Sequence, residues 1–139
     1  MYVHFKKLIT NDINLNFSAP PRSFEFNFTK VSSETVNFTC EADGVFPMPK
    51  ITLLQLDLEE KSPSLVSGVK TVVHSHSTTG AYHVQVSREI RDRELASRDP
   101  ILFECILSIP GTDYENNKKI LYYPGKVYES HFYTEIAFY

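Results

Sequence analysis

Hydrophobic and polar side chains alternate along most of this chain, and helical periodicity is poor almost everywhere. Residues 23–28 alternate cleanly after the Pro20-Pro21 break and predict a first strand. Other segments rich in β-branched and aromatic residues recur between turn signals. They predict further strands over residues 34–41, 50–58, 82–86, 101–109 and 118–123, with one or two short strands over 64–73, interrupted at Gly68.

Glycines and prolines separate these segments. Residues 43–49 are predicted to form a turn, because their glycine and two prolines prevent regular strand pairing. Residues 78–80 and 110–113 predict two more turns. The charged segment 87–100 is interpreted as a solvated connection with weak surface ion pairs and room for one short helical turn.

The pattern therefore predicts an all-β domain, and the composition fits one. The chain has 139 residues, of which 42% are hydrophobic and 22% charged, as expected for a single globular unit. We place that domain at residues 16–125. Residues 1–15 are interpreted as a remnant of an upstream region, and 126–139 as an aromatic C-terminal tail too short and polar to anchor in a membrane.

Charge and motifs exclude several classes of protein. The net charge of −3 argues against a nucleic-acid binder that neutralises phosphates. No apolar run approaches the roughly 20 residues that span a bilayer, so no transmembrane segment is predicted in this chain. The sequence has no glycine-rich phosphate loop, nucleophile elbow or H-E-x-x-H motif. We therefore expect neither an enzyme nor a cofactor.

The two cysteines, Cys40 and Cys105, each lie in a strand-like run. They are either two unrelated buried thiols or one long-range disulfide between strands. A disulfide would stabilise the domain by roughly 4 kcal/mol in the chain-entropy account and would imply an oxidising compartment.

Three N-x-[ST] sequons point to the same compartment, with acceptors at Asn16, Asn27 and Asn37. Alternation places Phe38 and Cys40 on one face of their strand and Asn37 on the other, so a glycan there would leave the core untouched. The first ten residues contain no apolar signal-peptide segment. We interpret the chain as an incomplete sequence from an extracellular protein, secreted or at the cell surface, rather than an intracellular one.

Residues 40–53 resemble the immunoglobulin superfamily pattern of cysteine, small polar turn, glycine, Pro-x-Pro and strand C. Asp99 lies six residues before Cys105, where such domains often carry an aspartate. The resemblance covers about residues 16–125. It implies an immunoglobulin-like β-sandwich of C2 or I type, with about seven antiparallel strands in two sheets and a Cys40–Cys105 disulfide.

Two departures from the family pattern concern its core. The chain has no tryptophan, and Leu53 takes the place of the buried tryptophan on strand C. Phe103 replaces the corner tyrosine, so the hydrogen bond which that tyrosine makes cannot form. Both replacements are apolar, and we expect Phe38, Leu53, Val84 and Phe103 to line the core around the disulfide.

The layout of residues 91–95 and 103–109 is similar to that of the membrane-proximal immunoglobulin domain of invertebrate beaten path proteins. Those proteins are neuronal recognition molecules that pair with other immunoglobulin proteins. The resemblance implies cell-surface recognition or adhesion, with another cell-surface or secreted protein as partner, such as an immunoglobulin-superfamily receptor. It also implies a second immunoglobulin domain upstream of this one.

Tyrosines near the last loop and strand suggest where a partner binds, because tyrosine is favoured in protein interfaces. We nominate Asp113, Tyr114 and Tyr122 as interface residues, while alternate tyrosines also fit the core.

Two other functions stay open. One is a secreted ligand- or metal-binding β-sandwich using His74, His76 and His83, although we predict surface histidines and no metal site because the sequence places no third ligand beside His74 and His76. The other is an intracellular enzyme or regulator with free thiols.

Overall fold

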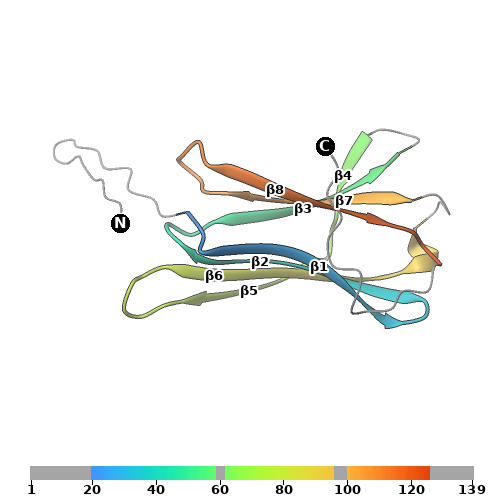
Figure 1. Cartoon of the computed structure of the whole chain (residues 1–139), viewed down its shortest axis with the longest axis horizontal. Coiled ribbons are helices and arrows are strands. Elements are labelled where there is room, and N and C mark those ends of the chain that lie inside the picture. The colour runs from blue at the N-terminus through green and yellow to red at the C-terminus, as the bar shows by residue number, and fades with distance from the viewer. Residues whose placement is uncertain (1–19, 59–61, 96–99, 126–139) are drawn as a thin grey trace.

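The computed structural model describes residues 20–58, 62–95 and 100–125 and folds them into eight antiparallel strands (Figure 1). A single 3-10 turn, η1 (Asp92–Glu94), follows the sixth strand. The strands are β1 (Ser23–Ser32), β2 (Thr35–Val45), β3 (Lys50–Asp57), β4 (Ser62–Leu65), β5 (Lys70–Ser75), β6 (Tyr82–Arg91), β7 (Ile101–Ser108) and β8 (Glu115–Tyr122).

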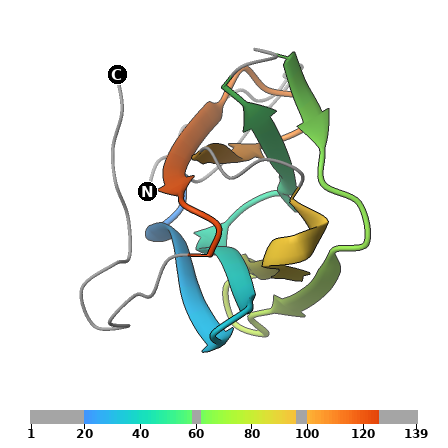
Figure 2. The same ribbon diagram turned by 90° about the vertical axis from the view of Figure 1, so that its right-hand side faces the viewer.

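The strands form two four-stranded sheets that face each other as a sandwich (Figure 2). One sheet, here called the β1 sheet, has the order β1-β2-β6-β5. The other, the β8 sheet, has the order β4-β3-β7-β8. This arrangement is compatible with an immunoglobulin-like fold, in which strands A, B, E and D oppose C, F and G. The predicted fold class is confirmed, with eight strands where the sequence predicts about seven.

Alternating side chains from both sheets fill the core between them. Phe38, Leu53, Val84 and Phe103 are all buried, as the sequence predicts. The rings of Phe38 and Phe103, from opposite sheets, have centroids 4.1 Å apart. A strand that buries every second residue removes apolar surface from water, while its backbone N–H and C=O groups form hydrogen bonds within the sheet. A period-two pattern of apolar residues therefore predicts such strands.

The predicted turn over residues 43–49 is wrong in its first half. β2 continues through Val45, which is fully buried, and its register with β6 shifts between Asp43 and Val45. Gly44 has φ +76°, and a Cβ there would lie 2.9 Å from the side chain of Arg22. Glycine therefore forms a bulge inside the strand, and the irregular connection is confined to residues 47–49.

The prediction of a solvated connection over residues 87–100 is also wrong in part. β6 runs on to Arg91 and buries Ile90, and the short helical turn forms at η1. Leu95, just after η1, is also buried. Apolar residues are sparse among the charges of this segment, so only their packing partners reveal that it belongs to the sandwich. Asp99 lies outside the described residues, as do residues 1–15 and 126–139.

Candidate functional site

The disulfide prediction is confirmed. Cys40 on β2 and Cys105 on β7 are joined across the sandwich, with 6.5 Å between their Cα atoms, and both are fully buried. Cys105 lies opposite Leu53 on β3, so the residue in the place of the family tryptophan packs beside the bond. The disulfide therefore links the centres of the two sheets, and the hypothesis of free thiols is wrong.

The three nominated interface residues do not form one surface. Asp113 is exposed in the turn after β7, and Tyr114 beside it packs partly against the core. Tyr122 lies at the far end of β8 and is fully buried, so its nomination as an interface residue is wrong. An eight-residue strand spans about 25 Å, which separates Tyr122 from the other two.

Tyr122 instead belongs to a polar cluster at the edge where β1 and β8 meet. Its hydroxyl donates to Asp92 Oδ1 at 2.6 Å, and Lys30 Nζ donates to the Tyr122 hydroxyl at 3.0 Å and to Asp92 Oδ2 at 3.2 Å. The backbone N–H of Gly125 donates to Asp92 Oδ2 at 2.7 Å. The Lys30 and Asp92 side chains are only 9% and 11% exposed. This cluster ties β1, η1 and the end of β8 together.

Sequence reasoning missed this cluster because Asp92 sits in a run of alternating charges that is typical of an exposed segment. Lys30 and Asp92 are 62 positions apart, and nothing local pairs them. The one local sign that this charged segment packs against the domain is Ile90, an apolar residue two positions before Asp92.

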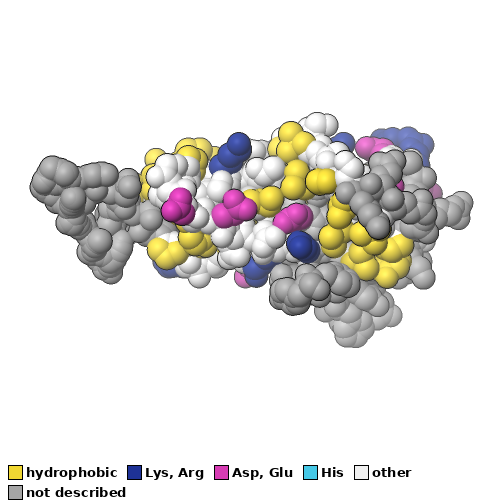
Figure 3. Space-filling model, turned by 90° about the horizontal axis from the view of Figure 1, so that it is seen from above, with side chains coloured by type: hydrophobic (Ala, Val, Ile, Leu, Met, Phe, Trp, Pro, Cys, Tyr) yellow, Lys and Arg dark blue, Asp and Glu magenta, His cyan; other side chains and the backbone are white. Residues whose placement is uncertain are grey.

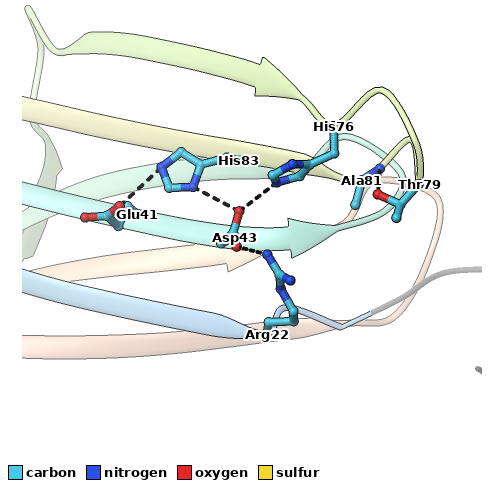
Figure 4. A network of polar contacts seen from close by, with 7 residues as sticks. All are labelled: Arg22, Glu41, Asp43, His76, Thr79, Ala81 and His83. Atoms are coloured by element: carbon cyan, nitrogen blue, oxygen red, sulfur yellow. Dashed lines mark hydrogen bonds and ion pairs between the residues drawn. The ribbon is translucent and has the colours of Figure 1, made fainter.

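Two histidines, His76 and His83, contact the Asp43 carboxylate on the outer face of the β1 sheet (Figure 4). Asp43 Oδ1 lies 3.2 Å from His76 Nε2 and 3.1 Å from His83 Nδ1, and Asp43 Oδ2 pairs with Arg22. The other ring nitrogen of His83 lies 3.2 Å from Glu41 Oε2. The His83 ring therefore lies between the carboxylates of Glu41 and Asp43.

This arrangement does not match the metal-site alternative. His74 pairs with His83 across β5 and β6, their ring centroids 6.3 Å apart, whereas His76 lies beyond the end of β5 and turns to Asp43. Within the described residues, no group of three or more histidine, cysteine, aspartate or glutamate side chains is placed to hold a metal ion. The cluster is an ion-pair network, which we call the Asp43 network.

The Asp43 network holds the pKa of the Asp43 carboxyl well below its usual range. Hydrogen bonding from His76 is the main cause, followed by hydrogen bonds from Arg22 and His83. Each partner favours the charged carboxylate over the neutral acid. The folded state therefore binds fewer protons at Asp43 than the unfolded chain does in mildly acidic solution.

A pH-dependent stability difference follows from this shift. The contribution of a carboxylate with a lowered pKa is complete above its unfolded pKa of 3.8 and is lost as the pH falls through the lower folded value. We expect Asp43→Asn to lower the free energy of unfolding by about 1 kcal/mol near neutral pH. The difference from the unmodified protein should shrink below about pH 4.

Urea denaturation of both proteins between about pH 6 and about pH 2 measures this difference. Asp113→Asn, which alters an exposed carboxylate in the turn after β7, is the matched control and should show no such trend. A difference between Asp43→Asn and the unmodified protein that stays constant over the whole range would contradict the assigned role of the network.

Polar side chains cover the outer face of the β1 sheet. The register aligns one row across all four strands, from β1 to β5: Asn27, Thr39, Ser87 and Lys70. A second row contains Thr29, Asn37 and Glu89. Two predicted glycosylation acceptors, Asn27 and Asn37, thus lie on this face, both half-buried. Asn16 lies outside the described residues.

The outer face of the β8 sheet differs, because an apolar row crosses it. The register places four residues opposite one another on neighbouring strands: Pro63, Leu56, Leu102 and Leu121. Leu102 lies between the buried residues Ile101 and Phe103, so alternation points it away from the core. Beside this row, Leu54 lies opposite Leu65, which is 67% exposed. We call these six residues the apolar row.

Figure 3 looks onto this face and shows hydrophobic side chains interspersed with charged ones. Antiparallel sheets with one solvated face normally alternate hydrophobic inside and polar outside. The β1 sheet follows that rule more closely than the β8 sheet, whose outer face combines the apolar row with Glu104 and Lys119. Sequence reasoning missed the apolar row because its residues lie on four strands, and only the register brings them together.

Comparisons with known proteins add no assignment: no family model matches the chain, and no curated protein matches it either. No helix in the described ranges is long and apolar enough to cross a membrane.

Proposed function

We propose that this chain is an immunoglobulin-superfamily recognition domain that works outside the cell by binding another protein, without catalysis. The observation that carries the proposal is the apolar row on the outer face of the β8 sheet. Apolar side chains gathered on a solvent-facing sheet are typical of an interaction surface. The disulfide between the sheets supports an oxidising compartment and hence an extracellular location.

The shape of this surface favours a protein partner. A row of side chains in register across four strands forms a broad face, and small molecules bind in concave pockets instead. The main contacts among the described elements join neighbouring strands of each sheet and link β1 with β8. The partner that best fits is a second cell-surface or secreted protein with an apolar sheet face, such as an immunoglobulin-superfamily receptor. In this respect the proposed role is that of the beaten path proteins, in recognition or adhesion.

A single charge placed in the apolar row should strongly weaken binding. We expect Leu102→Lys to weaken the complex at least about 30-fold, because losing a buried anchor costs about 2 kcal/mol or more. The matched control is Gln85→Lys, at a half-buried outward position in the middle of β6 on the opposite sheet. It should bind like the unmodified domain.

The measurement is a screen of the multimerised domain against a panel of secreted and cell-surface ectodomains, followed by surface plasmon resonance on the hits. Sedimentation of the domain alone tests whether a second copy is the partner. Circular dichroism must first show that both lysine variants fold. Equal binding by the Leu102→Lys variant and the unmodified domain would overturn the assignment of this face.

A further inference from the structure

A hollow of about 430 Å³ lies on the outer face of the β1 sheet. Asn37, one of the predicted glycosylation acceptors, is among the residues that line it. Its lining comes from four strands and the β4–β5 connection: Val31, Asn37, Gly68, Lys70, Ser87, Arg88 and Glu89. Asn37 stands opposite Glu89, and Lys70 opposite Ser87. Besides Asn37, the lining thus includes residues with a hydroxyl, an ammonium, a guanidinium and a carboxylate group.

We propose that Asn37 carries an N-linked glycan whose first sugar occupies this hollow. The inference rests on the extracellular location in the proposed function and deepens it. Sugar hydroxyl groups both donate and accept hydrogen bonds, and Lys70, Ser87 and Glu89 offer complementary partners. The volume lies within the range of small-molecule sites. Asn37 points away from the core, so the attachment leaves Phe38 and Cys40 undisturbed.

The attachment is a group transfer from a lipid-linked oligosaccharide pyrophosphate. A bond forms between Asn37 Nδ2 and C1 of the first sugar, and the bond between C1 and the phosphate oxygen breaks. The lipid pyrophosphate leaves with the electron pair of that bond, and the amide nitrogen loses one proton. Thr39, which completes the sequon, already holds the acceptor: Asn37 Nδ2 donates to Thr39 Oγ1 at 3.4 Å.

The chain contains its own matched control for this site. Asn27-Phe28-Thr29 and Asn37-Phe38-Thr39 are identical tripeptides on neighbouring strands, and Asn27 lies directly opposite Thr39. Asn27 does not line the hollow. A glycan at Asn27 should therefore extend into solvent, whereas one at Asn37 should contact the lining.

The two outer faces of the molecule would then have different roles, one carrying the glycan and the other binding the partner. A glycan in the hollow covers the β1 sheet and leaves the apolar row on the β8 sheet accessible to a partner. Removing the glycan should accordingly leave partner binding unchanged.

The test uses the full chain behind an added signal peptide, secreted from cells that attach only high-mannose glycans. Every version carries Ser18→Ala, which removes the Asn16 sequon. Thr29→Val leaves only the Asn37 sequon, Thr39→Val leaves only the Asn27 sequon, and the double variant has neither. Glycans are trimmed to one sugar, peptides are mapped by mass spectrometry, and amide shifts are recorded by NMR.

We expect the Thr29→Val protein to carry one glycan, on Asn37. Relative to the same Thr29→Val protein produced without glycans, its retained sugar should shift the amides of Gly68, Lys70, Ser87 and Glu89. The sugar on Asn27 in the Thr39→Val protein should leave those amides unchanged.

A secreted, disulfide-bonded protein with a bare Asn37 would overturn the glycan site but not the proposed function. A glycan on Asn37 that leaves the four amides unshifted would overturn its place in the hollow. Secretion without the Cys40–Cys105 bond would contradict the extracellular location and hence both proposals.

Discussion

Replacing Cys40 and Cys105 with alanine should lower the free energy of unfolding by about 4 kcal/mol. The bond closes a loop between positions 65 apart, and the chain-entropy account assigns about that stabilisation to a loop of this length. Domains of this size have total stabilities of about 5–15 kcal/mol. The loss is therefore a large fraction of the whole, and the variant should be partly unfolded at body temperature.

Urea denaturation of the oxidised protein, the reduced protein and the double alanine variant measures this loss. The reduced protein is the informative control, because it keeps both sulfur atoms in the core while opening the loop. If loop closure dominates, reduction should account for most of the loss. A reduced protein as stable as the oxidised one would show that packing of the two sheets, and not the cross-link, supplies the stability.

Asp92→Ala should destabilise the domain by about 3–5 kcal/mol, the cost of removing one partner from a buried ion pair. The substitution leaves the Lys30 ammonium, which is only 9% exposed, without its carboxylate. The Tyr122 hydroxyl loses its acceptor as well. Arg93→Ala, at the exposed neighbouring position, is the control and should change stability by less than about 0.5 kcal/mol.

A double-mutant cycle separates the ion pair from simple loss of packing. Lys30→Met combined with Asp92→Leu removes both charges at once, so the double variant should be less destabilised than the sum of the two single changes. Additive effects would contradict energetic coupling between Lys30 and Asp92, whose charged atoms lie 3.2 Å apart.

Local pattern was enough for the elements and much of the core. Alternation along residues 23–28 predicts a strand whose inward residues are those found buried, and the strongly apolar segment 101–109 predicts another strand of the core. The ends of the strands were harder to predict from the sequence. β2 passes through Gly44 and β6 continues into charged residues, because pairing with neighbouring strands outweighs local turn and charge signals.

The candidate site was less predictable than the core. Tyr122 was nominated because tyrosine is favoured in protein interfaces. Which side of a strand faces solvent depends on the register, however, and the register of β8 places the Tyr122 ring in the core. The Asp43 network pairs residues as distant in the sequence as Glu41 and His83, and the apolar row joins four strands. Contacts of that kind have no local sequence signal.

The sequence by itself determined the all-β class, the principal strands, the apolar core positions and the two cysteines available for pairing. Those properties follow from the alternation of apolar and polar side chains and from the chemistry of single residues, both of which can be read within a few positions of the chain. Only the tertiary structure decided that Cys40 meets Cys105, that Asp92 and Lys30 are buried together, and that the two outer faces differ in polarity. Each depends on which strands become neighbours and in what register, and that is settled by the packing of the whole sandwich.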